Sequence, residues 1–158
     1  MNSSGTNSGG WNSSQMRTKI CGTSLSSYSG TIIAVIPAAL RAVLKSVTKY
    51  TDNTGNSSAA SAVTATTDYF FLLSEYEVFG TISRGNPNES NKQAQYSYYS
   101  AGNSKVKYNH SATSTAVLWW LRSLYASSST RFVNVNTDGT VYASSAYYSN
   151  GFAPGFCV

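Results

Sequence analysis

Few side chains in this sequence have the types and spacing that catalysis requires. His110 is the only histidine, and it stands between Asn109 and Ser111. Nucleophilic catalysis needs a base within hydrogen-bond reach of the nucleophile and a third group that orients the base. A Ser–His–Asp set can be written from almost any serine-rich chain, so its presence carries little weight. We therefore interpret His110 as a loop residue and predict no catalytic residue.

The acidic residues favour structural roles. Glu75 and Glu77 lie two positions apart in a segment expected to form a helical turn, so their carboxylates would point to different faces. This spacing favours helix capping and contact with solvent. A calcium site needs several converging carboxylate and amide oxygens, and the chain has six acidic residues. We interpret residues 86–89 (Asn-Pro-Asn-Glu) as a turn, and we predict neither a metal ion nor a cofactor.

The two cysteines, Cys21 and Cys157, lie near opposite ends of the sequence. They are too few and too far apart for a sequence-local zinc motif. Two outcomes stay open: a disulfide that ties the C-terminal segment to the first helix, or two unpaired buried thiols.

Composition and charge restrict the class of protein. A length of 158 residues fits one domain, and charged residues make up only 11%. Solubility then depends on Ser, Thr, Asn and Gly, as on many extracellular and particle surfaces. The net charge is +5, but the basic residues are scattered, so we predict no nucleic-acid partner. No apolar run is long enough to predict membrane insertion. Residues 1–10 are polar, so we expect a flexible leader or the cut edge of a longer protein rather than a signal peptide.

The segment from Leu124 onward has the composition of a recognition surface. Before Phe152 it holds four Tyr, six Ser and three Asn, and its only charges are Arg131 and Asp138. Tyrosine supplies contact area at low cost in side-chain entropy, and Ser and Asn supply adaptable hydrogen bonds. This composition predicts a binding surface without catalysis.

The remaining elements would form the frame. We expect a short helix over 13–21 that begins at Asn12, a second helix over 37–48 that begins at Pro37, and a loop over 51–67. A buried strand is expected over 69–73 and a helical turn after Ser74. The later elements are a turn at 85–88, a helical turn within 91–99, a weak strand at 105–108, a strand over 117–121, a hairpin that joins 132–136 to 141–143 through Asp138-Gly139, and a final strand over 152–158. Helices come early and strands late, so the sequence predicts an α+β fold with a late, mainly antiparallel, twisted sheet.

Strand alternation selects the outward side chains. Val133 and Val135 share one face of their strand and are expected to point inward, so Phe132, Asn134 and Asn136 would point outward. Trp119 and Trp120 would point to opposite faces, one into the core and the other toward the base of the surface. The predicted ligand-binding residues are Tyr125, Ser127, Ser128, Asn134, Asn136, Tyr142, Ser144, Ser145, Tyr147, Tyr148 and Phe152.

Several segments together resemble a known pattern. They are Gly-Gly-Trp at 9–11, Met16-Arg17, the helix that begins at Pro37, Leu-Leu-Ser-Glu-Tyr-Glu at 72–77, Trp-Trp-Leu-Arg-Ser at 119–123, the hairpin around Asp138-Gly139, and Gly-Phe-Ala-Pro-Gly-Phe-Cys-Val at 151–158. The chain resembles a bacterial and phage domain family of uncharacterised function. That family is similar to the C-type-lectin-fold variable proteins of diversity-generating retroelements. Family members often close with Gly-Val-Arg-Pro-Ala-Phe, whereas Phe152, Ala153 and Gly155 stand here in place of Val, Arg and Ala.

The resemblance implies one C-type-lectin-like domain over 11–158, in which residues 124–156 are rewritten by mutagenic reverse transcription at template adenines. It also implies a protein or glycan ligand and a place on a phage particle or bacterial cell surface, as a homo-oligomer or part of a larger surface or tail protein. Two other functions stay open. The same broad fold resembles formylglycine-generating enzymes, which use two thiols near the C-terminus, but only Cys157 stands there. The other open function is that of a purely structural module of a surface or virion protein.

Overall fold

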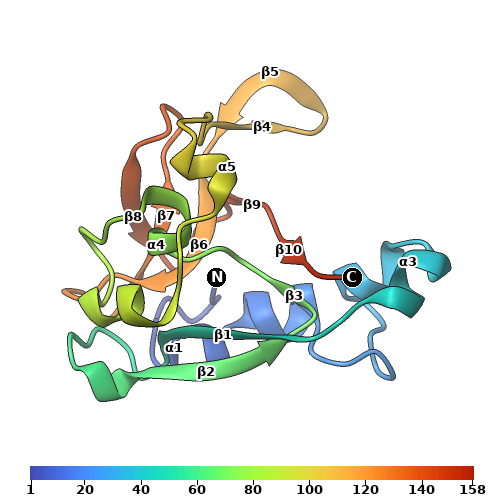
Figure 1. The fold of residues 1–158 in the computed structure, drawn as a ribbon, viewed down its shortest axis with the longest axis horizontal. Helices are drawn as coiled ribbons and strands as arrows, with labels where there is room; N and C mark the ends of the chain where they lie inside the picture. Colours follow the sequence, from blue (N-terminus) through green and yellow to red (C-terminus); the bar gives the residue numbers. More distant parts are fainter.

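Strand β6 (Trp119–Leu124) lies inside the largest sheet of the computed structural model, which covers residues 1–158. The strand order is β8-β7-β6-β9, with β7 (Arg131–Val135), β8 (Val141–Ser145) and β9 (Gly151–Phe152) (Figure 1). The β6–β7 and β7–β8 pairs are antiparallel, and the β6–β9 pair is parallel. Every residue of β6 is buried, so this strand forms the centre of the molecule.

Three two-stranded sheets surround it. They pair β1 (Val47–Asp52) with β2 (Val63–Asp68), β3 (Phe70–Phe71) with β10 (Gly155–Phe156), and β4 (Lys107–Asn109) with β5 (Ala112–Val117), all antiparallel. Figure 1 shows the β4–β5 hairpin extending from the body as an arm. Gly155 permits the β3–β10 pair, because a Cβ at this position would lie 2.7 Å from the Phe71 ring.

The helices are all short. The α-helices are α1 (Gly10–Ser13), α2 (Ile32–Val35), α3 (Ala38–Val43), α4 (Glu75–Phe79) and α5 (Ser97–Ser100). A π-helix η1 (Met16–Cys21) and two 3₁₀ helices, η2 (Ala60–Ala62) and η3 (Pro87–Lys92), complete the set. The predicted α+β class with mostly antiparallel sheets is confirmed.

The four-stranded sheet is covered on both faces. Trp120, Leu124 and Phe132 belong to one buried apolar cluster, which includes Trp11, Phe71 and Leu72. The other face contributes to a second cluster, which comprises Val78, Tyr99, Trp119, Leu121, Val133 and Val135. Both Trp119 and Trp120 are almost fully buried, because their strand alternates between two cores rather than between a core and solvent.

Arg122 is a buried polar centre beneath the sheet. Its guanidinium donates to the Glu77 carboxylate at 2.5 Å, to the Leu72 carbonyl at 2.7 Å and to the Thr51 hydroxyl at 2.9 Å, and it also donates to the Gln93 amide oxygen. Burial opposes ionisation of Glu77, but Arg122 and Lys49 outweigh burial and lower the pKa of this carboxyl. Arg122 therefore connects β6, β1, α4 and the segment after η3.

Glu75, Glu77 and Glu89 are all buried, so the predicted contact of Glu75 and Glu77 with solvent is wrong. Ser74 and Glu77 form a reciprocal capping box at the start of α4, as the sequence predicts for the Ser74 cap. The Glu75 carboxylate accepts from the backbone amides of residues 83–85. Glu89 accepts from the Ser123 hydroxyl at 2.6 Å and from an amide of β1 at 3.1 Å. Each carboxylate therefore stabilises a loop from within.

Glu89 makes the free energy of unfolding depend on pH. Burial raises the pKa of Glu89 from 4.5 to about 7 in the folded protein. The folded state therefore binds the proton more tightly than the unfolded state, and stability decreases as the pH rises from about 4.5 through about 7. At roughly 1.4 kcal/mol for each pKa unit, the loss reaches about 3 kcal/mol.

We expect Glu89→Gln to remove this loss. Urea unfolding of wild type and variant at pH 5 and pH 8 measures it: the stability difference should move by up to about 3 kcal/mol in favour of the variant at the higher pH. Other titrating groups are common to both proteins and cancel in the difference. Parallel stability curves would show that Glu89 has an ordinary pKa.

Three local predictions differ from the structure. The helix expected over 37–48 ends at Val43, and β1 begins at Val47. The loop expected over 51–67 contains η2 and most of β2, which pairs with β1 along its length. The helix expected over 13–21 is split into α1 and η1, and the predicted Asn12 cap is absent, since α1 follows Gly9.

The predicted flexible leader is instead packed against the late part of the chain. The Asn2 amide donates to the Ala146 carbonyl at 2.9 Å, and the Asn7 amide donates to the Ser129 carbonyl at 2.9 Å. Met1, Asn2 and Asn7 are buried. Residues 1–10 therefore belong to the domain. Cys21 is buried and Cys157 is half-buried, and both are free thiols rather than a disulfide.

Candidate recognition site

The β7–β8 hairpin positions the late segment, as the sequence predicts. Val135 pairs with Val141 and Arg131 with Ser145. The Asp138 carboxylate accepts from the Thr140 amide at 2.9 Å and hydroxyl at 2.6 Å, and Gly139 takes a φ of 86° that suits glycine. Local turn chemistry therefore sets the register of the two strands.

The hairpin does not present all of the predicted outward residues. Val133 and Val135 are buried, as expected, but Phe132, Asn134 and Ser144 are buried as well. The Asn134 amide donates to the Ser144 hydroxyl at 2.8 Å. The prediction that Phe132 and Asn134 point into solvent is wrong because the first apolar cluster covers that face of β7.

Three of the predicted anchor residues lie together on the surface. Tyr142, Tyr147 and Tyr148 are 47%, 57% and 51% exposed. The rings of Tyr147 and Tyr148 meet edge to face with centroids 4.6 Å apart. The hydroxyl of Tyr147 raises the pKa of Tyr148, and Tyr142 raises it further while Arg131 lowers it. These four side chains, Arg131 included, are close enough to form one surface, which we call the tyrosine cluster.

Two hollows lie on either side of the chain segment 149–152. The larger, of about 590 Å³, lies at the base of the β4–β5 arm and is lined by Lys107, Tyr108, Asn109, His110, Ala116, Val117, Leu118, Trp119, Thr137, Ser149, Asn150, Gly151 and Phe152. The smaller, of about 350 Å³, reaches the tyrosine cluster and is lined by Met1, Asn2, Ser3, Gln15, Met16, Lys19, Ile20, Trp120, Ala146, Tyr147, Tyr148, Ser149, Asn150 and Phe152. Ser149, Asn150 and Phe152 border both hollows.

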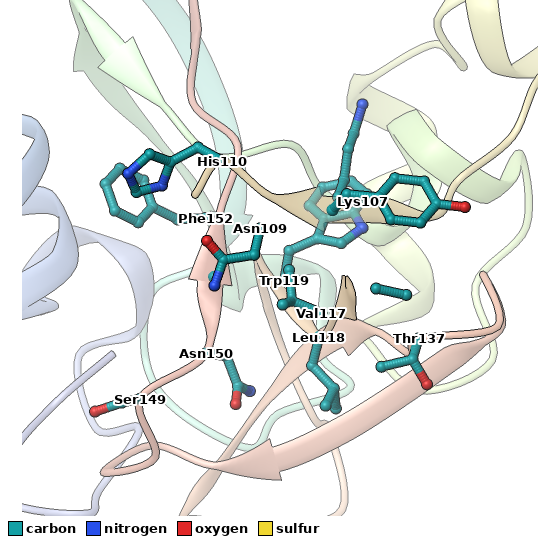
Figure 2. A pocket seen from close by; sticks show the side chains of 13 residues that line it. Lys107, Asn109, His110, Val117, Leu118, Trp119, Thr137, Ser149, Asn150 and Phe152 are labelled. Carbon is teal, nitrogen blue, oxygen red and sulfur yellow. The ribbon is translucent and has the colours of Figure 1, made fainter. Parts of the chain in front are cut away.

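The larger hollow combines amide groups with aromatic rings. Figure 2 shows the side chains of Asn109 and Asn150 in its middle, with His110 and Phe152 on one side of the view and Thr137 on the other. The Asn150 amide nitrogen is buried and has no hydrogen-bond partner within the chain. Phe152 is 41% exposed and is available for contact from either hollow.

The remaining predicted site residues lie elsewhere or are partly covered. The Tyr125 ring faces the Arg84 guanidinium, whose carbon lies 5.6 Å from the ring centroid. Ser127 is exposed, and the Ser128 carbonyl accepts from the Asn7 side chain at 2.6 Å, so residues 1–7 adjoin this loop. Asn136 and Ser145 are half-buried at the two ends of the hairpin. The structure thus brings together Tyr142, Tyr147, Tyr148 and Phe152. Tyr125 is not part of this group, because its ring faces Arg84.

Sequence reasoning missed the residues that complete the two hollows. The smaller hollow takes Met1, Asn2 and Ser3 from a segment predicted to be a flexible leader. The larger hollow takes residues 107–110 from β4 and the arm. Nothing in the sequence shows that residues 107–110 line the same hollow as residues 149–152.

Two further features of the side chains bear on these hollows. His110 is exposed, and no group of three or more His, Cys, Asp and Glu side chains is placed to hold a metal ion. No helix is both long enough and apolar enough to cross a membrane.

Comparison with protein families identifies one match. A family model described as a domain of unknown function, DUF6273, matches residues 1–158. No curated protein and no solved structure matches the chain.

Proposed function

We propose that this chain, which belongs to the DUF6273 family, is a non-catalytic binding domain that presents the tyrosine cluster and Phe152 to a protein or glycan ligand. The observation that carries the proposal is the contrast within one segment. Tyr142, Tyr147 and Tyr148 are exposed and adjacent, while Phe132, Val133 and Val135 of the same hairpin are fully buried. Large exposed aromatic rings on a rigid frame are typical of binding surfaces.

The resemblance of the chain to variable proteins of diversity-generating retroelements supports a more specific function. The domain would have a C-type-lectin-like fold, and residues 124–156 would be its diversified segment, as in variable proteins of diversity-generating retroelements. It would act on a phage particle or bacterial surface, as a homo-oligomer or within a larger surface or tail protein, without nucleic-acid binding or membrane insertion. Because both faces of β7 are packed, diversification would be confined to the exposed positions of this segment.

An enzyme of the formylglycine-generating type gains no support from the cysteines. Burial raises the pKa of the Cys21 thiol to about 12, so very little thiolate forms at neutral pH. Cys157 pairs through its backbone with Lys45 rather than with a second thiol. Neither cysteine has the environment of a reactive pair.

Sequencing the gene across sibling genomes tests the proposal. We expect changes to concentrate at Tyr142, Tyr147, Tyr148 and Ser149 and to spare Val133 and Val135, which serve as internal controls in the same segment. Uniform drift along the chain would instead favour a purely structural module.

Loss of the two adjacent rings should separate binding from folding. We expect Tyr147→Ala combined with Tyr148→Ala to reduce binding at least tenfold, because aromatic residues carry a large share of binding energy. The free energy of unfolding should change by less than about 1 kcal/mol, since both side chains are exposed. Arrays of bacterial surface glycans and proteins, probed with wild type and variant, measure binding.

Tyr98→Ala is the matched control, because Tyr98 is equally exposed but lies on α5. It should leave every array signal unchanged. An equal loss of signal in the control and the double variant would contradict a specific role for the tyrosine cluster.

A further inference from the structure

The surface of the protein is strongly cationic because its acidic side chains lie inside. Five of the six acidic residues are buried, and Asp138 alone is exposed. Three basic residues, Arg17, Lys49 and Arg122, form the ion pairs of the structure. The other eight of the eleven basic residues form none. Such a surface attracts anionic partners.

One hollow gathers positive charge within a small space. It has a volume of about 350 Å³, lies between β1 and the segment that joins η3 to α5, and contains none of the predicted site residues. Its lining comprises Thr48, Lys49, Tyr50, Glu77, Lys92, Gln93, Ala94, Gln95, Tyr96, Ser97 and Arg122. We call it the lysine hollow.

A single carboxylate serves two cations at the floor of the lysine hollow. The Lys49 ammonium lies 2.9 Å from Glu77 Oε1, and Arg122 lies 2.5 Å from Glu77 Oε2. Lys49 also donates to the Tyr96 hydroxyl at 2.9 Å and lies 4.1 Å from the centroid of the Phe71 ring. The Tyr96 ring centroid lies 5.3 Å from the same ammonium. Glu77, Phe71 and Tyr96 therefore hold the Lys49 ammonium in place.

Lys92 adds a third positive charge at the rim. Its side chain is exposed, and its ammonium lies 5.8 Å from the centroid of the Tyr50 ring. Among the neighbouring carboxylates, only Glu77 lines the hollow, and it pairs with Lys49 and Arg122. Glu75 is bonded to the backbone of residues 83–85, Glu89 is bonded to Ser123, and neither lines the hollow. The lining therefore holds two cations that share the Glu77 carboxylate, the buried Arg122 and the partly exposed Lys49, together with the exposed and unpaired Lys92.

We propose that the lysine hollow is a second binding site, which takes a monosaccharide-sized ring that carries an anionic group. The anionic group would lie between Lys92 and Lys49. The rings of Tyr50 and Tyr96 offer apolar contact to a sugar face, and the hydroxyls and amides of Thr48, Gln95 and Ser97 offer hydrogen bonds to sugar hydroxyls. A carboxylate and a phosphate supply the same charge, so both a sugar acid and a sugar phosphate fit this chemistry.

Isothermal titration with glucuronate, glucose 6-phosphate and glucose tests the charge requirement on the wild-type chain. We expect at least one of the two charged sugars to bind at least tenfold more tightly than glucose. Binding of glucuronate alone assigns a carboxylate, and binding of the phosphate sugar alone assigns a phosphate. Equal affinity for glucose, or no binding of either charged sugar, would overturn the proposal. Equally strong competition by acetate or inorganic phosphate would reduce the site to an adventitious ion only.

Two matched variants test the location. Lys92→Gln should weaken binding of the charged sugar at least tenfold, whereas Lys45→Gln removes the same charge from another exposed site and should leave affinity unchanged. Equal losses in both variants would show general attraction rather than a site. The bound sugar should also shift amide NMR signals of residues 92–97, and shifts confined to residues 142–152 would overturn the location. The variant that combines Tyr147→Ala and Tyr148→Ala should bind the sugar with wild-type affinity. Sugar binding at the lysine hollow is therefore tested independently of ligand binding at the tyrosine cluster.

Discussion

Replacement of Arg122 by methionine is expected to lower the free energy of unfolding by about 3–5 kcal/mol, as removal of one partner from a buried ion pair generally does. The side chain is fully buried and bridges four parts of the chain. Methionine would fill part of the volume but would leave the Glu77 carboxylate and the Leu72 carbonyl without their donor. Urea unfolding at pH 7, monitored by circular dichroism, measures the loss.

Arg131→Met is the matched control for this prediction. Arg131 begins the adjacent strand β7, but its side chain is exposed and forms no ion pair. We expect its replacement to change stability by less than about 0.5 kcal/mol. Similar losses in both variants would show that the buried network contributes little beyond general charge.

Leu72→Ala is expected to destabilise the protein by about 2–5 kcal/mol, because it opens a cavity in the larger apolar cluster. Leu72 follows β3 and is fully buried beside residues from the early helices and from β6. Thermal and urea unfolding should agree on the loss.

Ser128→Ala tests whether the late loops tolerate substitution. Ser128 lies in the loop between β6 and β7, and its hydroxyl contacts only nearby atoms of Thr130. Its replacement should change stability by less than about 0.5 kcal/mol. Equal losses for Leu72→Ala and Ser128→Ala would contradict the division between a buried frame and a tolerant late segment.

Predictions based on local chemistry agree best with the structure. The Ser74 cap and the Asp138-Gly139 hairpin each depend on interactions between residues close in sequence, whereas β3, within the predicted strand at 69–73, pairs with Gly155–Phe156. Helix capping and turn formation need no knowledge of the rest of the fold.

Tertiary packing explains the errors. Strand β2 consists mainly of Thr and Ala, so it lacks the large apolar residues that reveal a strand, and its pairing with β1 decides its structure. The apolar spacing of Leu40, Val43, Leu44 and Val47 suits a helix, yet Val47 begins β1 and α3 buries none of its residues. The pairing of β1 with β2 therefore determines the structure of residues 47–52, although the apolar spacing that ends at Val47 suits a helix.

The candidate site was predictable only in part, for the same reason. Tyr142, Tyr147 and Tyr148 are exposed because they belong to an outer strand and a loop. Asn134 looks outward by alternation, but β7 lies between two cores, a fact that no pattern within the hairpin shows. Likewise, Glu89 reads as part of a turn, whereas its burial depends on contacts with β1 and β6.

The hydrogen bonds between the two ends of the chain have a consequence for folding kinetics. Asn2 bonds to Ala146 and Lys45 to Cys157, and β9 pairs with β6 although the β7–β8 hairpin lies between them in sequence. Contacts between residues so far apart close long loops and slow the search for the native state. We therefore expect the hairpins to form early and the large cluster to close last, on a time scale of milliseconds to seconds. During synthesis on the ribosome, residues 1–145 could not complete the core until β9 and β10 had been made.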